Sequence, residues 1–63
     1  MANDFPSMAE VEHRRQRAQL SILELCREAK IAAWSYHRLR KREMNPRMDT
    51  LKRLYGALDR RGA

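Results

Sequence analysis

The fold is decided by residues 20–41, which read LSILELCREAKIAAWSYHRLRK. Ser21 is followed three residues later by Glu24, and this spacing is a capping box, the pattern that begins a helix. Leu20 before the cap and Leu25 after it have the spacing of a hydrophobic staple, which orients the chain as the helix begins. The pattern therefore predicts a short helix that opens at Ser21 and runs through Ala29.

A tight turn at Lys30 and Ile31 is predicted next, followed by a helix over residues 32–41 that buries Tyr36 and Leu39. Pro46 biases Asn45 away from helical dihedrals, so a loop is expected around residues 43–47. The first helix is predicted from Met8 to about Ala18, because Ser7 and Glu10 form another capping box. Its inward residues are expected to be Met8, Val11 and Ala18, and its outward ones Glu12, Arg15 and Gln19.

The last helix is predicted from Met48 to about Arg60, with Gly62 where a helix would end. Its apolar stripe has helical spacing and consists of Met48, Leu51, Leu54, Tyr55 and Leu58. No stretch alternates as a strand would. The expected fold class is all-α, a compact four-helix bundle. Its expected organisation is an N-terminal arm over 1–6, predicted to be flexible, a domain over 7–61 and a C-terminal tail over 62–63.

Length and charge restrict the function. A chain of 63 residues forms one small domain with little room for a catalytic cleft, so an enzyme is not expected. Lys and Arg number 14 against 8 Asp and Glu, a net charge of +6. The residues up to His37 balance to zero, whereas nine basic and three acidic residues follow from Arg38 onward. This asymmetry favours a polyanionic partner, with nucleic acid ahead of an anionic membrane.

Two helices joined by a short turn, the second of them basic, form the helix-turn-helix pattern. Residues 8–58 resemble the lambda-repressor/Cro (XRE-type) family of helix-turn-helix DNA-binding domains and align with its pattern without a gap. The matching positions are Leu20-Ser21, Leu25, Cys26, Ala29, Ile31, Tyr36, Leu39, Asn45-Pro46, Met48, Thr50, Leu51, Leu54 and Leu58.

The chain also departs from the family pattern. Lys30 replaces the turn glycine, so either it adopts a left-handed conformation at some cost or the turn differs from that of the family. Ala32 replaces the usual Ser or Thr cap, a loss of about 1 kcal/mol. Arg42 stands where the family often has glycine. The fifth helix of many members is absent, and Ile22 and Leu23 are apolar where the family is usually polar, so we expect a homodimer.

Helical spacing places one set of residues opposite the buried side of the helix over 32–41: Ala33, Trp34, His37, Arg38 and Lys41. The resemblance implies base contacts for Ala33, Trp34 and Arg38, and His37 shares their face. Arg38 is the strongest candidate, because a guanidinium binds guanine O6 and N7 together; the alternative is a phosphate contact. Trp34 contacts thymine methyls or, alternatively, covers the core or a dimer interface.

The expected phosphate contacts are Ser21, Arg40, Lys41, Arg42 and Arg47. Ser21 has the alternative of being only a helix cap.

Other chemistry is not expected. His13, His37 and Cys26 lack the spacing of a zinc site, and Cys26 is interpreted as a small buried apolar residue. No cofactor, metal, small-molecule effector or membrane partner is predicted. A single cysteine fits a reducing cytosol, so a cytoplasmic protein of prokaryotic or phage type is expected.

The sequence therefore predicts a sequence-specific regulator of transcription, a repressor that binds a palindromic operator on double-stranded DNA as a homodimer. The alternative is a protein-interaction module, an antitoxin or adaptor, that uses an apolar patch of Ile22, Leu23 and Trp34.

Overall fold

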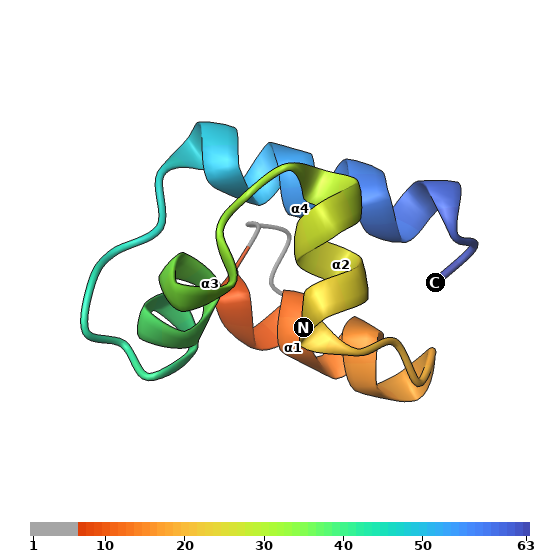
Figure 1. Cartoon of the computed structure of the whole chain (residues 1–63), viewed down its shortest axis with the longest axis horizontal. Helices are drawn as coiled ribbons and strands as arrows, with labels where there is room; N and C mark the ends of the chain where they lie inside the picture. Colours follow the sequence, from red (N-terminus) through yellow and green to blue (C-terminus); the bar gives the residue numbers. More distant parts are fainter. Residues whose placement is uncertain (1–6) are drawn as a thin grey trace, which may run out of the picture.

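The structure is a computed structural model that describes residues 7–63, and these residues form four helices and no strand (Figure 1). The helices are α1 (Met8–Arg17), α2 (Ile22–Ala29), α3 (Ala33–Arg40) and α4 (Met48–Arg60). The predicted all-α class is confirmed. The predicted boundaries agree to within one residue, since Ala18, Ala32 and Lys41 are caps rather than helical residues. The predicted arm over 1–6 lies outside the described residues.

Side chains cap the first two helices but not the last two. The Ser21 hydroxyl accepts from the Glu24 N–H at 3.0 Å, and the Glu24 carboxylate accepts from the Ser21 N–H at 3.1 Å, so the predicted capping box is confirmed. The Ser7 hydroxyl accepts from the Glu10 N–H at 3.2 Å. Ala32 precedes α3 in an extended conformation and makes no side-chain cap. The N-terminal N–H groups of α3 therefore lack the side-chain partner that stabilises α1 and α2.

All four helices end in a Schellman motif, in which a residue with positive φ lets the chain hydrogen-bond back to the last turn. In each motif, one backbone hydrogen bond joins an N–H to the carbonyl oxygen five residues earlier, with an N–O distance of 2.8–3.1 Å. These bonds run from Leu20 to Arg15, from Ile31 to Cys26, from Glu43 to Arg38 and from Ala63 to Leu58. The left-handed residues are Gln19, Lys30, Arg42 and Gly62, with φ between 58° and 72°. Only Gly62 avoids the steric cost of this conformation. Gly62 and Ala63, assigned to a tail from the sequence, complete the motif of α4.

Replacing Lys30 with glycine is expected to stabilise the fold by about 1 kcal/mol, because Lys30 has φ 61° and ψ 46° and a Cβ in that region is strained. The measurement is the free energy of unfolding from urea denaturation. Lys30→Ala is the matched control, since it removes the same charge but keeps the Cβ. Equal stability of the Gly and Ala variants would show that the left-handed turn carries no strain.

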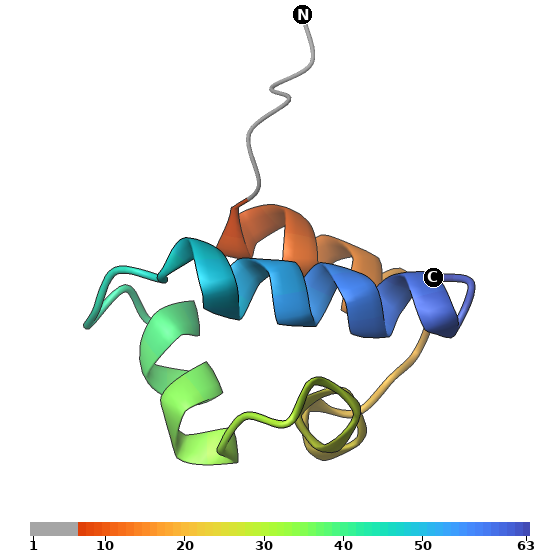
Figure 2. The same ribbon diagram turned by 90° about the horizontal axis from the view of Figure 1, so that it is seen from above.

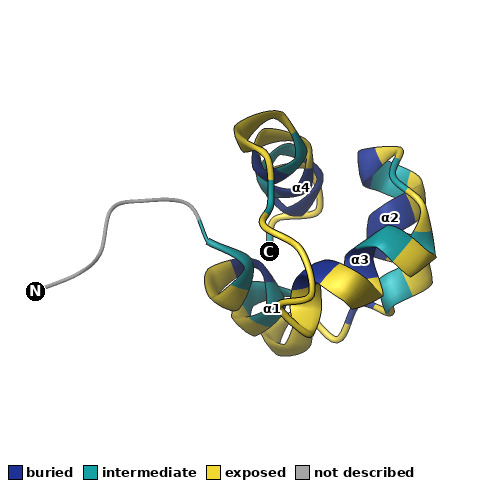
Figure 3. Ribbon diagram, turned by 90° about the vertical axis from the view of Figure 1, so that its left-hand side faces the viewer, coloured by how far each residue is buried: buried dark blue, intermediate teal, exposed yellow. Residues whose placement is uncertain are grey.

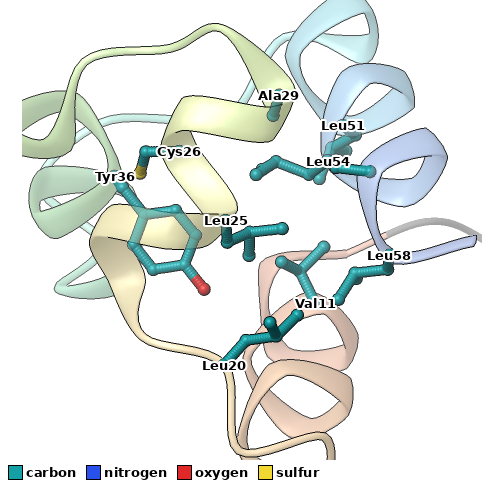
Figure 4. Close-up of a cluster of buried hydrophobic side chains, with 10 residues drawn as sticks. Val11, Leu20, Leu25, Cys26, Ala29, Tyr36, Leu51, Leu54 and Leu58 are labelled. Carbon is teal, nitrogen blue, oxygen red and sulfur yellow. The ribbon is translucent and has the colours of Figure 1, made fainter. Parts of the chain in front are cut away.

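The core lies where the four helices meet (Figure 4). Its buried residues are Val11, Leu20, Leu25, Cys26, Ala29, Tyr36, Leu39, Leu51, Leu54, Ala57 and Leu58. In Figures 2 and 3, α2 and α3 lie together on one side of the pair formed by α1 and α4. This arrangement leaves the outer surface of α3 uncovered by any other described element.

Four predictions about burial are wrong. Ala18 and Met48 are exposed rather than inward, because Ala18 caps the end of α1 and Met48 lies in the first turn of α4, beyond the core. Glu12 and Arg15 were expected in water, yet their side chains are only 16% and 12% exposed. They pair with each other at 2.7 Å, and this pairing offsets the cost of removing both charges from water.

Candidate nucleic-acid interface

Residues 30–32 form the turn between α2 and α3, and this turn makes the axis of α3 differ in direction from that of α2. Lys30 reverses the chain with its left-handed conformation, and Ile31 packs against the core. Ala32 is extended and starts α3. Figure 2 views α2 nearly end-on, whereas α3 is seen from the side. The two helices therefore pack together at a steep crossing, with α3 at the edge of the molecule.

The outer face of α3 carries four exposed residues: Trp34, His37, Arg38 and Lys41. Tyr36 and Leu39 anchor the opposite side of the helix in the core. The structure thus brings together four of the five residues that helical spacing placed on this face. Ala33 differs, because it is half-buried and packs against the core. It borders the exposed face without lying at its centre.

Trp34 is 63% exposed and does not cover the core. The guanidinium of Arg38 lies 5.9 Å from the centre of the Trp34 ring, within the range of a cation–π contact. Arg38 Nε is also 3.7 Å from a carboxylate oxygen of Glu43. Exposed ion pairs of this kind contribute little stability. Arg38 is therefore held loosely in place and remains available to another acceptor.

The predicted phosphate-binding residues divide into two groups. Lys41, Arg42 and Arg47 are exposed at the end of α3 and in the loop before α4, and none forms an ion pair with another residue of the described part of the chain. Arg40 instead points toward α1, where its NH1 lies 3.4 Å from Glu12 Oε2. Ser21 acts as a helix cap and is exposed.

Glu12 is the centre of a hydrogen-bond network that the sequence analysis missed. Its Oε1 accepts from the Tyr36 hydroxyl at 2.6 Å and from Arg15 Nε at 3.1 Å. Its Oε2 accepts from Arg15 NH2 at 2.7 Å, from Gln16 at 3.1 Å and from Arg40 at 3.4 Å. One signal for it was present, because a tyrosine predicted to be buried needs a partner for its hydroxyl.

This network changes the acid–base behaviour of its members. Burial by itself would raise the pKa of Glu12, but the hydrogen bonds from Arg15 and Tyr36 outweigh it and lower the pKa from 4.5 to about 2. Burial and the Glu12 carboxylate raise the pKa of Tyr36. The hydrogen bond to Glu12 raises the pKa of Arg15. Glu12 is therefore ionised, and Tyr36 protonated, throughout the neutral range.

The fold is expected to lose about 2 kcal/mol of stability between pH 4.5 and about 2, because the pKa of Glu12 is lower in the folded chain than in the unfolded one. A lowered pKa stabilises the fold at pH values above the unfolded value, and protonation removes this stabilisation as the pH falls. Urea denaturation at a series of pH values measures the loss. Glu12→Gln should show a shallower decline over the same interval, while Glu24 and Glu28 titrate identically in both proteins. Parallel curves would mean that Glu12 does not carry the effect.

Cys26 is a buried free thiol whose pKa is raised by burial, which keeps it protonated and unreactive. In residues 7–63, no group of three or more His, Cys, Asp or Glu side chains is placed to hold a metal ion. Of the four described helices, none has the length and apolar character needed to cross a membrane.

The alternative apolar patch is smaller than expected. Leu23 is 58% exposed and Trp34 is 63% exposed, but Ile22 is half-buried and packs against the core. Two of the three predicted residues are thus presented to solvent.

The chain matches no protein-family model, and no curated protein or solved structure is significantly similar to it.

Proposed function

We propose that this protein is a helix-turn-helix DNA-binding protein and that the outer face of α3 enters the major groove of duplex DNA. The observation that carries this proposal is the division of α3: one side is anchored in the core by Tyr36 and Leu39, and the other presents Trp34, His37, Arg38 and Lys41 to solvent. No acidic residue occurs within α3. A major groove admits one α-helix, and a helix with this face meets no repulsion from phosphates.

In this proposal some of the exposed residues contact bases and the others contact phosphates. Arg38 donates to guanine O6 and N7, and Trp34 contacts thymine methyl groups. His37 and Ala33 lie beside them on the same helix. Lys41, Arg42 and Arg47 bind phosphates at the end of α3, and Ser21 offers its hydroxyl and the nearby N–H groups of α2 to another phosphate. Arg40 is the weakest candidate, since it is paired with Glu12.

Binding as a homodimer, the protein would act as a transcriptional repressor by covering a palindromic site. Two recognition helices related by a two-fold axis contact half-sites one helical turn apart, ~34–36 Å along the duplex. Exposed Leu23 is a candidate for the apolar part of the dimer interface. Sedimentation at micromolar concentration is the measurement for this part. A monomer mass both in solution and on DNA would contradict it.

The proposal is tested by selecting bound duplexes from a random pool. The expected outcome is a motif with two symmetric halves spaced by one helical turn. Affinity for the selected duplex should fall linearly with the logarithm of the salt concentration, with a slope of about −0.9 per phosphate neutralised. Three free cations per protomer predict a slope of roughly −3 per protomer. A pool that yields no motif would overturn sequence-specific binding.

The second candidate is a protein-interaction module, which the exposure of Leu23 and Trp34 favours. Binding of a protein through such apolar side chains would depend little on salt, unlike binding to DNA. Leu23→Ser separates the two functions on a duplex with a single half-site, where one protomer binds and this residue is outside the proposed groove contacts. It should leave affinity for that duplex unchanged and abolish binding of a protein partner.

A further inference from the structure

α3 depends on contacts with the rest of the protein for its position. It has eight residues, no side-chain N-cap and two buried side chains, Tyr36 and Leu39. A helix this short is unstable by itself in water. The turn that follows it contains Arg42, a non-glycine residue with a left-handed conformation. Contacts with the other helices therefore have to hold α3 in place.

Apolar packing alone restrains rotation of a helix weakly, because the hydrophobic effect has no direction. Hydrogen bonds do have direction, and α3 has two that end on one carboxylate. Tyr36 and Arg40 lie one turn apart on the same side of α3, and both donate to Glu12 of α1, at 2.6 and 3.4 Å. Two attachment points along one helix fix both its rotation and its distance from α1.

Glu12 is itself held firmly. Arg15 donates to both of its carboxylate oxygens, and Arg15 NH1 donates in turn to the Leu20 carbonyl oxygen at 2.7 Å. Leu20 is a core residue between α1 and α2. The network thus connects α3 through Glu12 and Arg15 to the segment that joins the first two helices, so the carboxylate acts as a fixed anchor.

We propose that Glu12 is the positioning residue of α3: its carboxylate sets the rotation of the helix and thereby the direction in which Trp34 and Arg38 point. The effect on choice of DNA sequence rests on the proposed function, whereas the effect on α3 itself does not. A small rotation of α3 moves the tip of Arg38 away from a base edge but leaves the phosphate contacts of flexible lysines and arginines intact. Glu12 therefore acts on discrimination between sequences rather than on general affinity for DNA.

The test compares Glu12→Gln with Glu28→Gln in the full chain. Both variants remove one negative charge, but Glu28 pairs with Arg60 of α4, and none of its hydrogen bonds or ion pairs within residues 7–63 involves α3. The first readout is hydrogen exchange of the free protein. We expect the amides of α3 to exchange about tenfold faster relative to those of α4 in Glu12→Gln, and at unchanged relative rates in Glu28→Gln.

The second readout is the ratio of affinities for the selected duplex and for a random duplex. Glu12→Gln is expected to lower this ratio about tenfold, whereas Glu28→Gln should leave it unchanged. Partial unfolding lowers both affinities by the same factor, so a purely stabilising role does not change the ratio. Tyr36→Phe removes only the hydroxyl donor and keeps the ring, so it should change both readouts in the same direction by a smaller factor, in a protein that stays folded.

Unchanged relative exchange of α3 in both Glu12→Gln and Tyr36→Phe would overturn the proposal. Faster exchange of α3 together with an unchanged affinity ratio would overturn it as well, since the rotation would then not matter for recognition. If the wild-type protein shows no preference among duplexes, the proposed function fails. The exchange readout still decides in that case whether Glu12 positions α3.

Discussion

Tyr36→Ala is expected to unfold most of the protein at room temperature. Tyr36 is completely buried among the helices (Figure 4), and its hydroxyl donates to Glu12. Removing a buried aromatic ring costs about 3–5 kcal/mol. The Glu12 carboxylate, which is partly buried, also loses a hydrogen bond, which adds about 1–3 kcal/mol. A domain of 63 residues has a free energy of unfolding of roughly 3–9 kcal/mol. The loss expected for Tyr36→Ala is therefore comparable to the total stability of the domain.

Far-ultraviolet circular dichroism of Tyr36→Ala, with urea denaturation of the wild type as reference, measures the effect. Tyr36→Phe is the matched control, because it keeps the ring and loses only the hydrogen bond, at a cost of about 1–3 kcal/mol. This variant should keep its helical spectrum and a cooperative transition. A native spectrum with wild-type stability in Tyr36→Ala would mean that α3 does not need its anchor in the core.

Arg38→Ala is expected to lower affinity for the selected duplex by about 5–150-fold for each half-site that is contacted, and to remove the preference at one base pair of each half-site. The fold-change corresponds to the roughly 1–3 kcal/mol that a bidentate contact with guanine contributes. The fold should not change, because Arg38 contacts only the exposed Glu43 and the face of Trp34. Repeating the selection from the random pool with the variant measures the lost preference directly.

Arg42→Ala is the matched control for Arg38→Ala. Both are exposed arginines near the end of α3, but Arg42 lies in the turn after the helix, beside the backbone of a bound duplex in the proposed arrangement. It should weaken selected and random duplexes by the same factor and make the salt dependence shallower by about one phosphate. If Arg38→Ala also weakens both duplexes equally, Arg38 contacts a phosphate and its proposed role in reading bases is wrong.

The sequence predicted the helices well because their signals are local. The capping box at Ser21 and Glu24 and the glycine at 62 each act within one helical turn, and the structure confirms both. The left-handed conformation of Lys30 was one of the two outcomes expected from the missing glycine, and it is the one observed. Leu51, Leu54 and Leu58 followed from their spacing alone.

The sequence failed where burial depends on a distant partner. Glu12 and Arg15 were expected in water because charged residues usually lie there. Their own ion pair is local, but the Tyr36 hydroxyl that donates to Glu12 lies 24 positions away in the chain. The phosphate contact predicted for Arg40 stays a prediction, but the sequence did not reveal that this residue pairs with Glu12. Met48 matched the apolar spacing of its helix, but the first turn of α4 extends past the core and leaves it exposed.

By itself, the sequence determined the number of helices, their boundaries to within a residue and four of the five side chains that it placed on the outer face of α3. These properties depend on backbone hydrogen bonds and on helical spacing, which act over three or four residues. Only the tertiary structure decided how α3 is held, because the bonds from Tyr36 and Arg40 to Glu12 join helices that are far apart in the chain. A directional bond between distant residues depends on where the whole fold places both partners, and no spacing in the sequence contains that information.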